Sequence, residues 1–393
     1  MKILQINNNH YKAGGAETVY FNTISLLRKY GHEVISFSRK SSQAIKTNEN
    51  EYFVDFNTNL FSRFYYKSAV RELNKVLDKD KPDIVHIHRV IGGITFSILP
   101  LLKKYEVPVV MTIHDFRMLC PVTAFMNKSG DICEKCLGGK YFNCIIQNCS
   151  PEGVLRSISI TAESYLRDLF IPYEKYVDQF IFVSDFSKNK FFEVNNNLRD
   201  KSLRLYNFTE KFHFRVNSGK YFLYLGRLSR EKGIYTLLSA FNSLPQINIK
   251  IIGDGELKGA IERYKLKNVE LLGYKEGDEL NELINHASFV IMPSECYENN
   301  PMSIIESFAH GKPVIGTNVG GIPEIVEENK TGFLYAPKDH NSLAKKIILA
   351  DQLSKDEYSK MSSNAYNYAI EHFSPEKHYK NLLDVYERVL SRK

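Results

Sequence analysis

The sequence predicts an α/β protein made of two domains in tandem, each a parallel β-sheet with helices on both faces. Short β-branched or aromatic runs alternate with stretches of helical periodicity, which is the pattern of doubly wound sheets. This alternation begins at residue 2 and starts again at Tyr221. The 393 residues are enough for two such domains, and no repeat or low-complexity tract interrupts them.

The predicted elements follow one another in a regular order. In the first half, residues 2–7 predict a strand, 8–15 a loop, and 16–30 a helix that ends at Gly31. Further strands of the first half are predicted over 32–37, 83–88, 107–113 and 180–183. Strands of the second half are predicted over 221–225, 247–252, 269–272, 288–293, 313–317 and 332–335. The chain closes with a helical pattern whose apolar positions are Leu382, Leu383, Val385 and Val389.

The composition is typical of a globular protein, with 43% hydrophobic and 25% charged residues. The sequence has no uninterrupted apolar run of about 18 residues, so no membrane span is expected. The N-terminus turns polar after a short strand pattern and lacks the apolar core of a signal peptide. We therefore expect a cytoplasmic location.

The formal net charge is +7, and basic residues at positions 63, 67, 71 and 75 share one side of a predicted helix. Two interpretations stay open: the solvated face of a packed helix, or peripheral contact with the anionic inner face of the plasma membrane. No recognised nucleic-acid-binding module accompanies the charge, so nucleic acid is not an expected partner.

Two glutamates, Glu298 and Glu306, lie eight residues apart around the start of a predicted helix. The preceding apolar run predicts a buried strand, and loops after such strands are where open α/β sheets bind ligands. Pro301 favours the helix start, and the amides of the first turn would point toward an anion. These first-turn residues are Met302, Ser303 and Ile304, after the entry residue Asn300. Carboxylates suit hydroxyl groups and amides suit phosphate, so a nucleotide sugar fits this segment.

The segment from Glu298 to Glu306 resembles the Glu-x7-Glu motif of retaining glycosyltransferases of the family 4, or group 1, type. The resemblance continues through residues 320–326 and 329–334. It implies the GT-B fold, with two doubly wound, Rossmann-like domains facing across a cleft. The implied parts are an acceptor domain over 1–205, a donor domain over 206–374, and a C-terminal helix over 375–393 that crosses back to the first domain.

Arg227 and Lys232 follow the first strand of the second half. Two cations there can neutralise a diphosphate without a metal, both when the donor binds and when the diphosphate leaves. The residues match the family's Gly-Arg…Lys-Gly element, which implies that they hold the donor diphosphate. The family also implies that Glu306 holds the ribose hydroxyls and Glu298 the sugar hydroxyls. Further donor contacts are expected at Gly14, Gly15, Gly226, Gly253, Tyr274 and Lys275, together with Asn300 and the first-turn residues of the helix.

His114 and Asp115 end a strand of the first half, at the edge where ligands bind. The resemblance implies that His114 contacts the donor sugar and acts in catalysis together with the two cations and the two glutamates. Asp115 is expected on the acceptor side as an orienting group, because a retaining course can use the departing phosphate oxygen as the base.

Five of the six cysteines fall within a loop predicted over 120–150. In a reducing compartment, clustered cysteines favour metal over disulfides. A cysteine pattern in a subset of similar transferases implies a structural zinc ligand set of Cys120, Cys133, Cys136 and Cys149. Unligated thiols in an acceptor-binding loop are the open alternative. No catalytic cofactor is expected.

The expected reaction is transfer of a hexose or N-acetylhexosamine from a UDP- or GDP-linked sugar to a saccharide, with retention. A lipid-linked saccharide of bacterial surface polysaccharide synthesis is the expected acceptor. Two other functions compete. A nucleotide-sugar epimerase of the same fold would convert its donor without any acceptor, and a non-catalytic nucleotide-sugar-binding protein would show no turnover at all.

Overall fold

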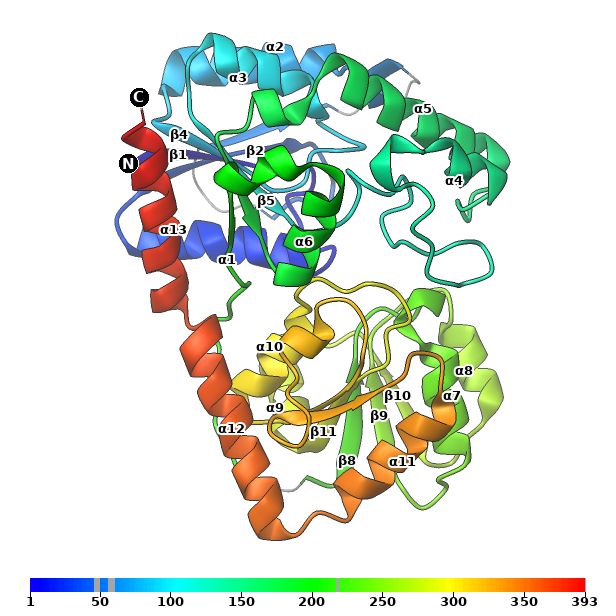
Figure 1. Cartoon of the computed structure of the whole chain (residues 1–393). Coiled ribbons are helices and arrows are strands. Elements are labelled where there is room, and N and C mark those ends of the chain that lie inside the picture. Colours follow the sequence, from blue (N-terminus) through cyan, green and yellow to red (C-terminus); the bar gives the residue numbers. More distant parts are fainter. Residues whose placement is uncertain (46–49, 56–60, 217–218, 393) are drawn as a thin grey trace. The chain divides into compact units, whose positions relative to one another are not determined.

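The computed structural model of the chain describes residues 1–45, 50–55, 61–216 and 219–392 (Figure 1). The chain divides into two compact units. Unit 1 contains Met1–Lys128, Cys133–Tyr206 and Pro375–Lys393, and unit 2 contains Ser129–Ile132 and Asn207–Ser374. Residue 393 of the predicted C-terminal segment lies outside the described residues.

Unit 1 contains a seven-stranded sheet, counted within the described residues, in which all neighbouring strands are parallel. Its order is β3 (Glu51–Val54), β2 (Glu33–Arg39), β1 (Lys2–Ile6), β4 (Ile84–Ile87), β5 (Val109–Ile113), β6 (Gln179–Phe182) and β7 (Ser202–Arg204). Most of these strands are nearly continuous runs of β-branched and aromatic residues, and such runs form strands that are buried on both faces of a parallel sheet.

The helices of unit 1 connect these strands or cover the sheet (Figure 1). They are α1 (Gly15–Lys29), α2 (Lys67–Asp80), α3 (Leu99–Lys104), α4 (Phe142–Ile146), α5 (Val154–Phe170), α6 (Asp185–Val194) and α13 (Pro375–Leu390). The apolar side of α13 supplies Leu382, Val385 and Val389 to a core shared with β1 and α1. The last helix is therefore part of the core of unit 1.

Unit 2 contains a six-stranded parallel sheet in the part of the chain that the structure describes. Its order is β10 (Val269–Gly273), β9 (Ile249–Ile252), β8 (Tyr221–Leu225), β11 (Ala287–Met292), β12 (Val314–Thr317) and β13 (Gly332–Tyr335). Its helices are α7 (Ile234–Asn242), α8 (Lys258–Tyr264), α9 (Gly277–Asn285), α10 (Met302–Ala309), α11 (His340–Asp351) and α12 (Lys355–Phe373).

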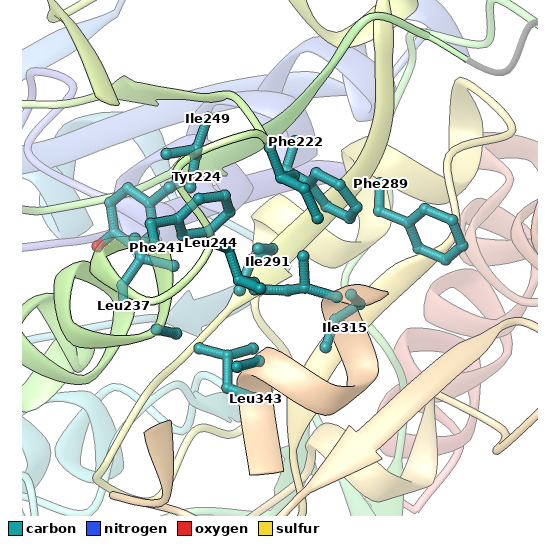
Figure 2. Packing of buried hydrophobic residues seen from close by; sticks show 14 of the residues in the cluster. Phe222, Tyr224, Leu237, Phe241, Leu244, Ile249, Phe289, Ile291, Ile315 and Leu343 are labelled. Carbon is teal, nitrogen blue, oxygen red and sulfur yellow. The ribbon is translucent and has the colours of Figure 1, made fainter. Parts of the chain in front are cut away.

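The core of unit 2 lies between the sheet and helices α7, α11 and α12 (Figure 2). The rings of Phe222, Phe289 and Phe333 follow one another across the sheet, with centroids about 6 Å apart. Phe241 of α7 and Leu343 of α11 pack into the same cluster. Burying each side chain of this size contributes about 1.5–3 kcal/mol, so this core makes a rigid base for the loops that follow the strands.

The structure confirms the predicted α/β class, with two parallel sheets and helices between the strands. All of the predicted strands are present. The sequence analysis missed two short strands, β3 and β7, which lie at the two edges of the first sheet and have only four and three residues.

The strand order creates one topological switch point in each sheet. In unit 1, β1 lies between β2 and β4, and in unit 2, β8 lies between β9 and β11. The chain leaves these central strands in opposite directions, so the loops after β1 and β4, and after β8 and β11, diverge and leave space for a ligand. Within the described ranges, no helix is long and apolar enough to cross a lipid bilayer.

Candidate functional site

The switch point of unit 2 brings together two segments that are far apart in sequence. Arg227 and Lys232 lie in the loop after β8, and Glu298 lies in the loop after β11. Because β8 and β11 are parallel neighbours, both loops leave the same edge of the sheet. The fold therefore places the predicted diphosphate-binding cations beside one of the two predicted carboxylates.

Lys232 and Glu298 form an ion pair. The Lys232 Nζ lies 2.5 Å from Glu298 Oε1, and the Ser294 hydroxyl donates to the same oxygen at 2.5 Å. Burial by itself would raise the pKa of Glu298, but the Lys232 ammonium, the Ser294 hydroxyl and Arg227 together lower it. Burial would lower the pKa of Lys232, and Glu298 raises it. Both groups are therefore charged at neutral pH.

Arg227 differs from this pair in its exposure. Its side chain is 66% exposed, and its guanidinium lies 3.9 Å from Glu231. The Tyr224 hydroxyl donates to the Arg227 carbonyl at 2.7 Å, which holds the backbone of the loop. The backbone of Arg227 is thus held in place while its cationic side chain is accessible. A side chain that binds an incoming phosphate needs both properties.

Helix α10 begins beside Glu298, with Pro301 at its N-cap. The Met302 and Ser303 amides belong to the first turn, as expected. The Ile304 amide, which we expected to be available to an anion, instead donates to the Pro301 carbonyl at 3.1 Å. This tight 3₁₀-type bond is common at helix starts and leaves one fewer amide for a ligand.

Asn300 is held in place before this helix by Asn207. The Asn207 amide donates to Asn300 Oδ1 at 2.7 Å, and Asn207 Nδ2 donates to the Asn300 carbonyl at 2.9 Å. Asn300 Nδ2 is buried and has no hydrogen-bond partner among the described residues. A buried donor without a partner is costly, so Asn300 has a hydrogen bond to offer to a ligand.

Glu306 lies one turn inside α10. Burial raises the pKa of Glu306 to about 7, and Lys211 lowers it only in part. The Glu306 charge also contributes to the raised pKa of Tyr274, so the two side chains are electrostatic neighbours. Glu306 is therefore half protonated near neutral pH, in contrast to Glu298.

Other predicted donor-binding residues surround the same edge of the second sheet. Gly226 and Gly253 follow β8 and β9, and a Cβ on Gly253 would lie 1.8 Å from the Gly226 carbonyl oxygen. Tyr274 is 63% exposed, and the Lys275 Nζ lies 2.5 Å from Glu279. Gly14 and Gly15 belong to unit 1, where both are exposed at the start of α1.

Unit 1 has a cavity of about 220 Å³ after β4 and β5. His114 and Asp115 lie on its wall together with the cationic side chains of Arg89, Arg117 and Arg156. Asp115 Oδ2 lies 3.1 Å from Arg89 Nε, and its Oδ1 accepts from the Arg117 amide at 2.9 Å. Both carboxylate oxygens are engaged, so the geometry suits an orienting role for Asp115 better than that of a base.

His114 is hydrogen-bonded into the interior of unit 1. Its Nε2 lies 2.9 Å from His88 Nδ1, and His88 Nε2 lies 2.8 Å from Gln5 Oε1. Burial lowers the pKa of His114 to about 3 and that of His88 well below its usual value, so both rings are neutral. An amide oxygen can only accept, so His88 carries its proton on Nε2 and accepts from His114 Nε2–H. His114 therefore presents Nδ1 as an acceptor.

The Gln5 amide, with its oxygen toward His88, also contacts α13. Gln5 Nε2 lies 3.4 Å from the Tyr386 oxygen, and the Tyr386 hydroxyl lies 2.7 Å from His86 Nδ1. His86 Nε2 in turn lies 2.7 Å from Thr112 Oγ1. When the Tyr386 hydroxyl donates to His86 Nδ1 and accepts from Gln5 Nε2, His86 carries its proton on Nε2 and donates it to Thr112. The network links His114 to the last helix of the chain.

Two family models match this chain, one within each half of the chain. A family model described as Glycosyltransferase Family 4 matches residues 13–198, and a model described as Glycosyl transferases group 1 matches residues 207–371. The chain belongs to these glycosyltransferases. The GT-B fold that the sequence predicted is confirmed by solved structures that share it.

Individual relatives of this chain agree with this assignment. An uncharacterized glycosyltransferase of Methanocaldococcus jannaschii is 36% identical over 177 residues, which cover 44% of this chain and 49% of the relative. A putative colanic acid biosynthesis glycosyltransferase of Escherichia coli is 30% identical over 155 residues, covering 36% of this chain and 38% of the relative. The matched regions thus span about half or less of these relatives. Relatives of the transferase occur in bacterial polysaccharide biosynthesis.

Solved structures share the fold over the whole chain. Sucrose-phosphate synthase from Thermosynechococcus elongatus has a TM-score of 0.76 at 19% identity and covers 100% of both chains. Anabaena HepE, solved in complex with UDP-glucose, has a TM-score of 0.70 at 18% identity and covers 99% of this chain and 100% of its own.

Five of the six cysteines lie in unit 1, and Cys296 lies in unit 2. Cys136 and Cys144 share a small apolar cluster with the partly buried Cys149, and the thiols of Cys144 and Cys149 are hydrogen-bonded. Burial raises the pKa of Cys120 to about 11 and that of Cys136 to about 12. All six cysteines are free thiols.

The four predicted zinc ligands are electrostatic neighbours: Cys136 interacts with Cys120 and Cys133, and Cys149 interacts with Cys120 and Cys136. In the described parts of the chain, no group of three or more His, Cys, Asp or Glu side chains could hold a metal ion. Cys144, which the prediction left out, is the residue in contact with Cys149. Zinc stays a prediction, and the metal content of protein purified under reducing conditions tests it.

The sequence analysis missed several residues that shape the candidate site. It assigned no role to Ser294 or Asn207, because a lone serine or asparagine carries no signal of its own. Gly320 and Gly321 were noted only as part of the resemblance. The structure places them against the loop of Glu298, since the Gly321 amide donates to the Glu298 carbonyl at 2.7 Å. A Cβ on Gly321 would lie 1.9 Å from the Asn299 carbonyl oxygen.

We expect Gly321→Ala to displace the loop that carries Glu298, since overpacking of this kind forces backbone shifts. The expected result is a rise of about tenfold in the KM for the sugar donor, because a small displacement of a positioning group is costly. Gly259→Ala is the matched control, since a Cβ there meets nothing within 4 Å. Equal donor kinetics for the two variants would contradict the role of Gly321.

Proposed function

We propose that this chain is a retaining glycosyltransferase that moves a hexose or N-acetylhexosamine from a UDP- or GDP-linked sugar to a saccharide acceptor. The observation that carries the proposal is the largely buried Lys232–Glu298 pair, with Arg227 beside it and the start of α10 adjacent. A diphosphate needs cations and amides, and sugar hydroxyls need carboxylates. A UDP-linked donor is supported by the description of Anabaena HepE in complex with UDP-glucose.

The proposed roles follow the charges of the site. Arg227 and Lys232 neutralise the diphosphate as the bond to the anomeric carbon breaks, and the first amides of α10 assist them. Glu298 holds the sugar hydroxyls, and Glu306 holds the ribose hydroxyls. His114 contacts the donor sugar. Positioning of this kind lowers the entropic part of the barrier.

We propose that the anomeric configuration is retained because both oxygens of the Asp115 carboxylate, after β5, already have partners within unit 1. Asp115 is held by Arg89 and by the Arg117 amide, so a departing phosphate oxygen is the better base for the acceptor hydroxyl. The acceptor is proposed to be a lipid-linked saccharide, in keeping with relatives named for polysaccharide biosynthesis.

A donor screen tests the proposal. Purified protein is mixed with a panel of UDP- and GDP-sugars, and thermal unfolding and slow donor hydrolysis are measured. We expect one donor to raise the unfolding midpoint and to be hydrolysed slowly. Arg227→Ala should abolish both effects while the unliganded midpoint stays unchanged. Epimer formation without any acceptor would favour an epimerase, and no response to any donor would contradict a transferase.

The raised pKa of Glu306 predicts a pH dependence of donor binding. A carboxyl accepts hydrogen bonds from two hydroxyls well only when it is ionised, and burial raises the pKa of Glu306 to about 7. Donor affinity should therefore rise about tenfold between about pH 6 and about pH 8, with release of a proton on binding. Calorimetry in buffers of different ionisation enthalpy measures both quantities. Glu306→Gln should show no such dependence, and a flat profile for the unaltered protein would refute the role.

The Glu306 carboxyl should also make the stability of the fold depend on pH. Stability should fall with rising pH, whereas donor affinity should rise. In the unfolded chain the pKa of a glutamate is about 4.5, whereas burial raises the pKa of Glu306 in the folded chain to about 7. The folded state then holds the proton more tightly, so this contribution to stability is present at low pH. It is lost as the pH rises from about 4.5 to about 7.

A further inference from the structure

Helix α5 turns its apolar side away from unit 1. The buried residues of α5 are mostly polar: Ser157, Ile160, Thr161, Glu163, Ser164 and Arg167. Its exposed residues are all apolar or aromatic: Val154, Leu155, Ile158, Ala162, Tyr165, Leu166, Leu169 and Phe170. Leu155 is 79% exposed and Leu169 is 73% exposed. A helix on the surface of a globular protein normally has the reverse arrangement.

Polar contacts lock the helix in this orientation. Arg167 Nη2 donates to the Met118 carbonyl at 3.0 Å and lies 3.1 Å from the Tyr141 hydroxyl. Glu163 Oε2 lies 3.4 Å from Arg117 Nη2. Rolling the helix to bury its apolar side would break these buried contacts, which are costly to leave unmade. The apolar side therefore stays outward.

The apolar surface continues beyond α5 on neighbouring elements. Phe142 and Ile146 of α4 are 48% and 67% exposed, and the Phe142 amide donates to the Tyr165 hydroxyl at 3.2 Å. At the C-terminal end of α5, the ring centroids of Phe170 and Phe64 lie 5.8 Å apart. We call the exposed residues of α5 together with Phe142 and Ile146 the α5 face. A continuous apolar surface of this kind indicates an interaction site.

Basic side chains border the α5 face. The exposed residues Lys135 and Lys140 lie beside α4, since the Asn143 side chain donates to their carbonyls at 2.8 and 3.0 Å. Beyond Phe64, the exposed Lys67 begins α2. Glu152, the acidic residue just before α5, is paired with Arg156 at 3.5 Å.

The remaining charges of α2 modify the earlier membrane hypothesis. Arg71 and Lys75, on the predicted basic side of that helix, both contact Glu72, at 3.1 and 2.8 Å. Their charge is thus partly compensated, and α2 has no exposed apolar surface comparable to that of α5. The basic residues of α2 can only supplement an apolar contact.

We propose that the α5 face lies in the interface of an anionic lipid bilayer. An apolar helix face with basic neighbours matches a surface that offers both acyl chains and negative headgroups. A second copy of this chain fits less well, because a twofold contact would bring like basic borders together. Arg156 of α5 lines the cavity that also contains His114 and Asp115. Docking through α5 would therefore hold this cavity near the membrane surface.

Vesicle flotation tests the proposal, which goes beyond the proposed transfer reaction. The full-length protein is mixed with vesicles of phosphatidylcholine alone, or of phosphatidylcholine and phosphatidylglycerol in equal parts. We expect binding to the anionic vesicles and much weaker binding to the neutral ones. The double variant Leu155→Asp/Leu169→Asp should bind the anionic vesicles about 100-fold more weakly. Leu349→Asp, at a leucine of α11 that is 43% exposed, is the matched control and should bind normally.

Folding and oligomeric state are measured on the same variants. Unchanged circular dichroism and unchanged slow donor hydrolysis show that the double variant is folded, and they separate a failure of docking from a failure of the proposed reaction. Three outcomes would overturn the proposal: no binding of the unaltered protein to anionic vesicles, equal binding of the double variant, or a dimer by light scattering that the double variant disperses.

Discussion

Lys232→Met is expected to abolish glycosyl transfer and to weaken binding of the nucleoside-diphosphate sugar by about 100-fold, since it removes a preorganised cation from the diphosphate. The variant also leaves the Glu298 carboxylate in a largely buried position without its ammonium partner. Breaking a buried ion pair from one side costs about 3 kcal/mol or more. Loss of function and loss of stability are therefore expected together.

A second variant separates these two effects. Lys232→Met/Glu298→Gln removes both charges, so most of the lost stability should return while donor binding stays weak. Chemical denaturation measures the stability, and calorimetry measures donor affinity. Arg230→Ala changes an exposed cation of the same loop, whose guanidinium donates to the Ser129 carbonyl, and should leave donor affinity unchanged. Unaltered donor affinity in Lys232→Met would show that the diphosphate binds elsewhere.

Gln5→Met is expected to lower kcat by about tenfold with little change in donor KM, through a residue buried below the site. The Gln5 oxygen accepts from His88, and this contact sets which nitrogen of His114 is protonated. Without it, His88 can turn or change tautomer, and His114 no longer presents Nδ1 reliably. His114→Ala should cost about 100-fold in kcat, as loss of a preorganised group does.

The conservative variant Gln5→Glu distinguishes tautomer control from packing. A carboxylate still accepts from His88 Nε2–H, so the tautomer of His114 should persist and activity should exceed that of Gln5→Met. Nitrogen spectra of histidine-labelled protein report the tautomer directly, with His114 Nε2 protonated in the unaltered protein. A His114 proton on Nδ1, or equal kcat for both Gln5 variants, would refute this role.

Much of the fold was predictable because it depends on local patterns. Alternating strand and helix periodicities predicted every strand of the two sheets except β3 and β7. β3 and β7 are short and lie at the edges of the first sheet. Edge strands need few apolar residues, so they leave little hydrophobic pattern in the sequence. The helix start at Pro301 and its end at Gly311, whose φ is 68°, also follow from the conformational limits of single residues.

The site was predictable only as a set of residue types. Arg227, Lys232, Glu298 and Glu306 stand in recognisable motifs, but no motif says which side chains touch. The pairing of Lys232 with Glu298 results from β8 and β11 being neighbours across the switch point. The different states of the two glutamates result from burial, which raises the pKa of Glu306, and from the nearby ammonium, which lowers that of Glu298.

The sequence by itself determined the class of fold, the tandem arrangement and the charged residues of the donor segment, because these depend on periodicity and residue type. Only the tertiary structure decided the tautomer of His114, the contact of Gly321 with the Glu298 loop and the outward apolar side of α5. Each of these depends on through-space contacts between residues distant in sequence, such as Gln5 with Tyr386 and Arg167 with Met118. Hydrogen bonding and burial act between such neighbours, and the order of residues along the chain does not reveal them.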